Sequence, residues 1–282
     1  MNHATDTPHP AGSLPPAGTL PPGGRKRLNP YLTGGITADW TDYLLAYQEA
    51  GADGIEVGLP FSDPVLDGAT IQEASDRALA RGATVAGILR DVAAIRSRLR
   101  IPLIAMTYAN LVFRAGPGRF CRQLAEAGFR GLIVPDLPVD EAEAVETAAA
   151  ECGLDLVMLV APVTPDERLA EIVTRGGGFL YAVSVMGTTG EREHLAASAG
   201  HLAARVKAIT DRPVLIGFGI SGPAQAAEAA RVADGVVVGA ALMRRVLDGA
   251  TPDDLRADVA ALRSALDSEV SAAYSQISGH RD

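Results

Sequence analysis

An alternation of helical and strand-like segments runs along the chain from Arg27 onward. Stretches such as "FCRQLAEAGFRGLIVP" and "AQAAEAARVADGVVVG" each combine a helical pattern, a glycine-containing turn and a short β-branched run. Glycine in the left-handed conformation is a common end for a helix, and near-continuous apolar runs are typical of strands buried on both faces. This pattern predicts parallel strands that are joined by crossover helices.

The pattern predicts eight strands, which suits a closed (β/α)8 barrel of about 250 residues. An open doubly wound sheet is the alternative, but such a sheet seldom has eight parallel strands at such even spacing. We therefore expect an α/β fold in which a single (β/α)8 TIM barrel occupies residues 25–282. The expected strands are 30–33, 54–58, 102–108, 131–135, 154–160, 178–184, 213–218 and 235–239.

The first 24 residues, "MNHATDTPHPAGSLPPAGTLPPGG", have a different composition from the rest of the chain. Proline interrupts both helices and strand ladders, and few of these residues could bury apolar surface. We predict that residues 1–24 form a disordered tail before the barrel.

One carboxylate interrupts the second apolar run, in the stretch "GIEVGLPFSDPVLDGATIQEA". Side chains alternate along a strand, so Glu56 faces away from Ile55 and Val57. If those two face the helices, Glu56 points into the barrel lumen, near the strand end where such barrels carry their active sites. The alternative is a structural carboxylate that accepts hydrogen bonds from Tyr181 or Thr107. Burial would raise the pKa of Glu56 and suit it to proton transfer near neutral pH.

Two more acids, Asp63 and Asp67, follow in the next loop. Each precedes a proline or glycine and could simply stabilise a turn, an alternative that is weaker for Asp67. Three acids within twelve residues also raise the possibility of Mg²⁺ or Ca²⁺, but no EF-hand spacing is present. His194 and His201 share a later helix face without a third ligand. We expect no metal site.

Glycines end the last two expected strands, in "GFGIS" and "VVVGAALMRR". In (β/α)8 barrels the loops after strands seven and eight, with a short helix N-terminus, commonly bind phosphate. Tight turns alone would also explain either glycine, but together they favour a phosphate site. Ser221 is the expected N-cap of the helix after the seventh strand.

The net charge of −9 makes nucleic acid or an anionic membrane an unsuitable partner. The basic cluster Arg25-Lys26-Arg27 is too short to bind DNA alone, and the two cysteines match no metal or redox spacing. No apolar run approaches the roughly 20 residues that span a bilayer, and the N-terminus lacks the features of a signal peptide. We expect a cytoplasmic protein.

The segment "GADGIEVGLPFSDPVLDGATIQEA" resembles the signature of the tryptophan synthase alpha subunit. The resemblance extends from about Asn29 to the last helix, through "MTYANLVFRAG", "GLIVPDLPVDE", "LVMLVAPVTPDERL", "GTTGER" and "GFGIS". It implies a (β/α)8 barrel that cleaves indole-3-glycerol phosphate to indole and glyceraldehyde 3-phosphate. The implied reaction is a retro-aldol cleavage that uses no metal or organic cofactor.

The resemblance also implies residue roles. Glu56 would protonate the indole C3 and take the glycerol hydroxyl proton, and Asp67 would accept a hydrogen bond from the indole N–H. Tyr181 would pack beside the glutamate, and Thr189 would belong to a lid. The family's phosphate-binding positions fall on Gly190, Phe218, Gly219, Gly239 and Ala240, and the indole slot would be lined by Tyr31, Met106, Ile133 and Phe218.

Members of this family normally dock on a pyridoxal-phosphate-dependent beta subunit, partly through the first and second βα loops. The sequence departs from the family pattern at Ile36, Val185 and Ala240. Two alternatives to the lyase remain: another phosphate-dependent barrel lyase or isomerase that keeps the acid pair, and a non-catalytic partner subunit.

Overall fold

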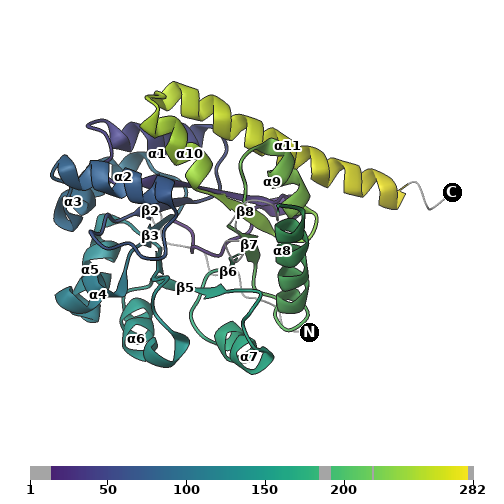
Figure 1. The fold of residues 1–282 in the computed structure, drawn as a ribbon, viewed down its shortest axis with the longest axis horizontal. Coiled ribbons are helices and arrows are strands. Elements are labelled where there is room, and N and C mark those ends of the chain that lie inside the picture. Colours follow the sequence, from purple (N-terminus) through teal and green to yellow (C-terminus); the bar gives the residue numbers. More distant parts are fainter. Residues whose placement is uncertain (1–13, 184–191, 218, 279–282) are drawn as a thin grey trace.

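The computed structural model describes residues 14–183, 192–217 and 219–278. Its strands close into a parallel barrel in sequence order, in which the eighth strand pairs with the first (Figure 1). The (β/α)8 prediction is confirmed. The strands are β1 Arg27–Thr33, β2 Ile55–Gly58, β3 Leu103–Met106, β4 Gly131–Ile133, β5 Asp155–Val160, β6 Leu180–Ala182, β7 Val214–Ile216 and β8 Gly235–Val238.

Helices surround the barrel, and the longest, α11, runs along one side of the molecule past α1 and α9 (Figure 1). No helix in the described ranges is long and apolar enough to cross a membrane. The helices are α1 Trp40–Glu49, α2 Ala69–Ala80, α3 Val85–Ile95, α4 Ala109–Ala115, α5 Pro117–Ala127, α6 Glu143–Glu151, α7 Asp166–Thr174, α8 Arg192–Lys207, α9 Pro223–Ala230, α10 Ala240–Leu247 and α11 Pro252–Ser278, with short 3-10 turns η1 Pro22–Gly24, η2 Arg96–Arg98 and η3 Val139–Glu141.

Glycines in the left-handed region follow several of these helices, as expected. Gly128 follows α5 with a φ of 108°, in the left-handed region, and Gly51 lies just beyond α1 with a φ of 93°. A glycine adopts this conformation without a steric penalty, so the chain can leave the helix and enter the next strand at once.

The strands separate two apolar layers. Ile55 and Val57 are fully buried in the layer between the strands and the helices. A second, inner cluster fills the lumen, and Glu56 points into it from the opposite face of β2, between Tyr31 of β1 and Ile104 of β3. The predicted direction of Glu56 is therefore confirmed. The inner cluster contains Ala17, Ile104, Ile133, Val157, Phe179, Tyr181, Leu215 and Val237.

Part of the N-terminal segment closes the lower opening of the barrel, at the N-terminal ends of the strands. Ala17 is fully buried in the inner cluster, and its backbone N–H donates to Asp155 Oδ2 at 2.8 Å. A small side chain fits here because Gly131 leaves the first residue of β4 bare. The prediction of a disordered tail is therefore wrong for residues 14–24, while residues 1–13 lie outside the described part of the chain.

Candidate active site

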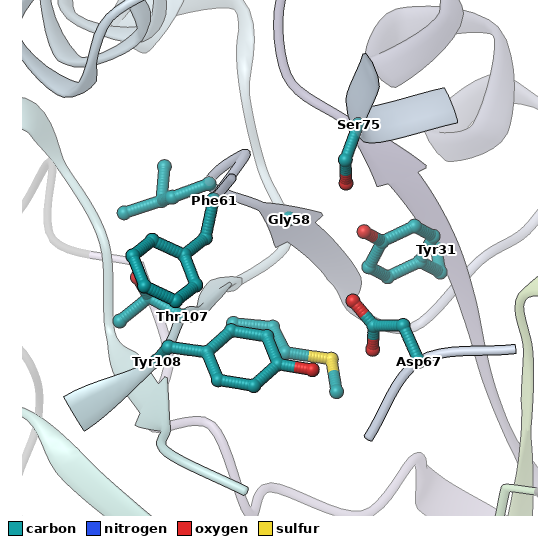
Figure 2. Close-up of a pocket in the computed structure, with 9 residues that line it drawn as sticks. Tyr31, Gly58, Phe61, Asp67, Ser75, Thr107 and Tyr108 are labelled. Carbon is teal, nitrogen blue, oxygen red and sulfur yellow. The ribbon is translucent and has the colours of Figure 1, made fainter. Parts of the chain in front are cut away.

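A pocket lies at the C-terminal ends of β1, β2 and β3, the end of the barrel that the sequence predicted for the active site (Figure 2). The β2–α2 loop and the first residues after β3 form its walls. The lining residues are Tyr31, Gly58, Leu59, Phe61, Asp67, Ser75, Met106, Thr107 and Tyr108.

Glu56 lies on β2, two residues before the pocket residue Gly58, and is fully buried. Its desolvation raises the pKa of the carboxyl to about 8, against smaller opposing effects of Arg27 and Asn29. Because this pKa is above 7, Glu56 carries its proton at neutral pH.

Neither carboxyl oxygen of Glu56 has a hydrogen-bond partner of regular geometry among the described residues. The Tyr181 hydroxyl donates instead to the Gly217 carbonyl at 3.5 Å, and the Thr107 hydroxyl is unpartnered in the same sense. The two hydroxyls that could have made Glu56 a satisfied structural carboxylate therefore do not do so. Buried polar groups without a partner are uncommon in proteins, so the carboxyl of Glu56 needs an explanation.

Asp67 enters the pocket from the loop above, and its carboxyl lies between the side chains of Tyr31 and Tyr108 (Figure 2). Partial burial raises the pKa of Asp67 to about 6, and a hydrogen bond from the Tyr108 hydroxyl opposes the rise. Asp67 is therefore mostly ionised at neutral pH.

Tyr108 connects this loop to the end of β3. Its hydroxyl accepts a hydrogen bond from the Leu66 N–H at 3.1 Å, next to its contact with Asp67. The Phe61 ring stacks on the Tyr108 ring with 5.3 Å between centroids. The Tyr108 side chain thus holds the loop at both Phe61 and Asp67.

The other acids near the strand ends have local partners. The Ser62 hydroxyl donates to Asp63 Oδ2 at 2.6 Å, on an exposed turn. Asp136 Oδ1 accepts from the Ala109 N–H at 2.8 Å, at the start of α4. No group of three or more His, Cys, Asp or Glu within the described ranges is placed to hold a metal ion.

Backbone groups at the ends of β7 and β8 form the region predicted to bind phosphate. Gly219 has a φ of 79°, and α10 begins at Ala240 directly after Gly239. The first N–H groups of α10 have no acceptor within the helix and are suited to an anion. Phe218 and Gly190 lie outside the described residues, as do Thr189 and Val185 of the expected lid.

The expected Ser221 N-cap is wrong, because α9 has Gly222 at the N-cap position and Pro223 in its first turn. Proline at the first helical position presets the helical φ and lacks an N–H group that would otherwise be unsatisfied. The helix therefore begins one residue later than a serine cap would place it.

The structure brings the described members of the predicted indole slot together. Tyr31 and Met106 line the pocket directly, while Ile133 pairs with Met106 in the sheet and lies in the lumen below. Tyr181 occupies the space above Gly217, where any side chain would collide with its ring. These residues surround the upper lumen above Glu56.

Sequence reasoning did not assign roles to Tyr108, Ser75, Arg27 or Asn29. Tyr108 stands two residues after the apolar run of β3, at a strand end, which is a usable signal. Ser75 is only 4% exposed on α2 and faces the pocket. Arg27, Asn29 and Tyr31 are every second residue of β1, so their side chains lie on one face of the strand. The sequence would have shown this if the strand had been expected to start at Arg27.

The model of the tryptophan synthase alpha chain family matches residues 21–273. An alpha chain from Chloroflexus aggregans is 47% identical over 226 residues, 79% of this chain and 85% of that one. One from Streptomyces coelicolor is 48% identical over 225 residues, 80% of each chain. A solved tryptophan synthase from Mycobacterium tuberculosis has a TM-score of 0.79 at 43% identity, over 86% of this chain and 93% of that one. The chain therefore belongs to the tryptophan synthase alpha chain family.

Proposed function

We propose that this chain is a carbon–carbon lyase that cleaves indole-3-glycerol phosphate to indole and glyceraldehyde 3-phosphate, with Glu56 and Asp67 as its catalytic carboxyls. Membership of the family supports the reaction. The observation that carries the residue assignment is the position of Glu56. Its carboxyl is sealed in the lumen with a raised pKa, below a pocket that holds Asp67.

Glu56 acts first as an acid and then as a base. Protonated at neutral pH, it donates its proton to C3 of the indole ring. The resulting carboxylate then takes the proton of the hydroxyl on the adjoining glycerol carbon. As that oxygen forms a carbonyl, the carbon–carbon bond breaks and its electron pair returns to the ring. Glu56 regains its proton, so the step balances without a further reagent.

Asp67 stabilises the charge that this proton transfer creates. Protonation at C3 places positive charge on the ring nitrogen, and an ionised carboxylate that accepts from the ring N–H lowers the energy of that state. The Tyr108 hydroxyl holds the Asp67 carboxylate in place.

The substrate phosphate lies at the ends of β7 and β8 in this proposal. With a net charge of −9, the molecule attracts an anion through local groups rather than through its overall field. Gly219, Gly239 and the α10 N-terminus offer backbone N–H groups. Ala240 contributes its N–H but has no hydroxyl to add.

We infer that the pyridoxal-phosphate-dependent beta subunit, the partner of this family, docks around the pocket mouth. Large apolar side chains are exposed beyond β2, β3 and β5, near the upper end of the barrel. They are Val65 at 80%, Leu66 at 53%, Phe113 at 47% and Val163 at 77% exposure. A cytoplasmic location, as expected from the sequence, belongs to the same proposal.

An assay of the purified chain tests the function. Incubation with indole-3-glycerol phosphate should release indole and glyceraldehyde 3-phosphate in equal amounts, and adding a beta subunit should accelerate the release. Asp67→Asn should retain substrate binding but lose most turnover. Absence of indole release both with and without the beta subunit, or comparable cleavage of sugar phosphates that lack indole, would overturn the proposal.

A further inference from the structure

A buried arginine lies in the floor of the lumen, at the start of β1. Arg27 is fully buried, and its Nε donates to Asn29 Oδ1 at 2.9 Å. Its Nη1 donates to the Thr19 carbonyl at 2.7 Å. The guanidinium lies 5.6 Å from the centre of the Phe179 ring. Because arginine is rarely buried without a partner or a task, this group needs an explanation.

The guanidinium occupies space directly below Glu56. Gly54 precedes Glu56 by two residues, so both residues face the lumen. A Cβ on Gly54 would lie only 2.6 Å from Arg27 Nη2 and 3.0 Å from Asn29 Oδ1. The glycine therefore leaves room for the Arg27 side chain in the layer beneath the catalytic carboxyl.

The polar atoms of this layer are not saturated. Arg27 Nη2, Asn29 Nδ2 and both Glu56 carboxyl oxygens are buried without a regular hydrogen-bond partner in the described part of the chain. The Asn29 amide nevertheless lies close enough to Glu56 to lower its pKa. Two donors and two acceptors without regular partners are therefore buried in the same layer of the lumen.

Arg27 supplies the positive charge that acts on Glu56. The ionisable neighbours of Glu56 are Arg27 and Tyr31 from β1 and Tyr181 from β6, while β3 faces it with Ile104. Burial raises the pKa of both tyrosine hydroxyls, so they are neutral at pH 7. Burial lowers the pKa of Arg27 to about 10, against the opposing effects of three nearby acids, Asp53, Glu56 and Asp155. The guanidinium is therefore charged at pH 7.

We propose that Arg27 is a positioning residue for Glu56: its guanidinium, fixed by Asn29 and the Thr19 carbonyl, stabilises the carboxylate that Glu56 becomes midway through the reaction. This inference rests on the proposed function. A carboxylate in a low-dielectric lumen is strongly destabilised unless an opposite charge lies nearby. Arg27 does not line the substrate pocket, so it acts through Glu56 and not on the substrate.

The test is an infrared titration that reads Glu56 directly. The protonated carboxyl of Glu56 has a carbonyl stretching band, which is identified because it is absent from Glu56→Gln. The intensity of this band is followed with pH in the unliganded full-length chain. Arg27→Gln removes the charge and should move the midpoint upward by about one pH unit or more. Arg27→Lys retains the charge and should titrate close to the wild type.

Arg212→Gln is a matched control. Arg212 is a second arginine at the lower end of the barrel; it is partly buried and donates to the carbonyls of Arg175 and Gly177. The acids that act on it are Asp155 and Glu146 rather than Glu56. Its loss should lower stability without moving the Glu56 midpoint.

Turnover gives a second reading. Arg27→Gln should lower kcat about tenfold or more while KM changes little, because substrate contacts are retained. If Arg27→Gln does not fold, Asn29→Leu removes both the Nε acceptor and the nearby amide, and it should also raise the midpoint.

The proposal is overturned if folded Arg27→Gln titrates Glu56 at the wild-type midpoint. If Arg27→Gln does not fold, an unchanged midpoint in Asn29→Leu has the same meaning. An equal shift in Arg212→Gln also overturns the proposal. The infrared reading does not depend on turnover. Full activity of Glu56→Gln would therefore defeat the proposed function while leaving the measured link between Arg27 and Glu56 standing.

Discussion

At the residue scale, two carboxyls in one site acquire different proton affinities from different surroundings. Glu56 is fully buried in the lumen, and its pKa rises to about 8. Asp67 is partly exposed and bonded to Tyr108, so its pKa rises only to about 6. When the pKa values of two carboxyls in one site differ in this way, the group with the higher pKa is the proton donor and the other is the anion. This separation supports the proposed roles, with Glu56 as the proton donor and Asp67 as the stabilising carboxylate.

The pH dependence of kcat/KM should reflect these two groups, because both pKa values are those of the unliganded protein. Activity needs ionised Asp67, which is lost as the pH falls through about 6, and protonated Glu56, which is lost as the pH rises through about 8. A bell-shaped profile with its maximum near pH 7 is expected. The alkaline limb is diagnostic, since the second ionisation of the substrate phosphate also falls near pH 6. Constant activity from pH 7 to 10 would contradict the role of Glu56.

Tyr108→Phe should remove the hydrogen bond that stabilises the ionised carboxylate of Asp67. Loss of a hydrogen bond to a charged group costs about 1.5–3 kcal/mol, so we expect kcat to fall by about 10- to 100-fold. The acid limb of the pH profile should move to higher pH. Tyr43→Phe is the control, because the Tyr43 hydroxyl donates to the Ala250 carbonyl away from the pocket. A Tyr108→Phe protein with the wild-type pH profile would show that the hydrogen bond from Tyr108 to Asp67 is not needed.

Glu56 could be predicted from the sequence because a carboxylate inside an apolar strand seldom has a purely structural role. Arg27 could not. It stands in the cluster Arg25-Lys26-Arg27, where the three residues look alike, yet Arg25 is partly exposed and Arg27 fully buried. The difference comes from the register of β1 against β8, which pairs Arg27 with Gly235. Register is a long-range property that the local pattern does not reveal.

At the element scale, β1 begins three residues before the strand that its apolar pattern predicts, at Arg27 rather than Pro30. Arg27 and Asn29 carry polar side chains into the lumen, so the run lacks the continuous apolar character of a doubly buried strand. The helices and the remaining strands were easier to predict, since alternating periodicity and glycine turns fix them locally. The extra length of β1 carries the proposed positioning residue.

The segment 14–24 acts as a floor to the barrel, an arrangement that composition alone could not predict. Its burial depends on the lumen opening that it fills. Ala17→Leu should overpack this floor and lower the free energy of unfolding by about 1–3 kcal/mol, measured by urea denaturation. The control is Leu20→Ala in the same segment, since Leu20 is 43% exposed. Equal stability of the Ala17 variant and the wild type would show that the floor does not contribute to folding.

At the scale of the whole molecule, the two ends of the barrel differ. The lower end is closed by packed chain around Ala17 and by the buried Arg27. The upper end carries the pocket and the exposed apolar side chains around it. In the proposed function, substrate entry and partner docking therefore share one face, and Arg27 at the opposite end supports the charge of Glu56.

Val65→Asp should weaken docking of the beta subunit. Val65 is 80% exposed on the β2–α2 loop, and burying a charge in an apolar interface is unfavourable. Calorimetric titration with a beta subunit should show at least a tenfold lower affinity, about 1.4 kcal/mol, while indole release by the isolated chain changes little. Ile209→Asp, at an exposed apolar site beyond α8, is the control. Unchanged affinity of the Val65 variant would place the interface elsewhere.

The proposed mechanism depends above all on the buried carboxyl of Glu56, which transfers the protons of the cleavage. Glu56→Gln keeps the size of the side chain but can neither donate nor accept those protons. Its rate of indole release from indole-3-glycerol phosphate should fall by about 10²–10⁴-fold, with substrate affinity within about threefold of the wild type. Indole release at the wild-type rate by a folded Glu56→Gln protein would contradict the proposed role of Glu56.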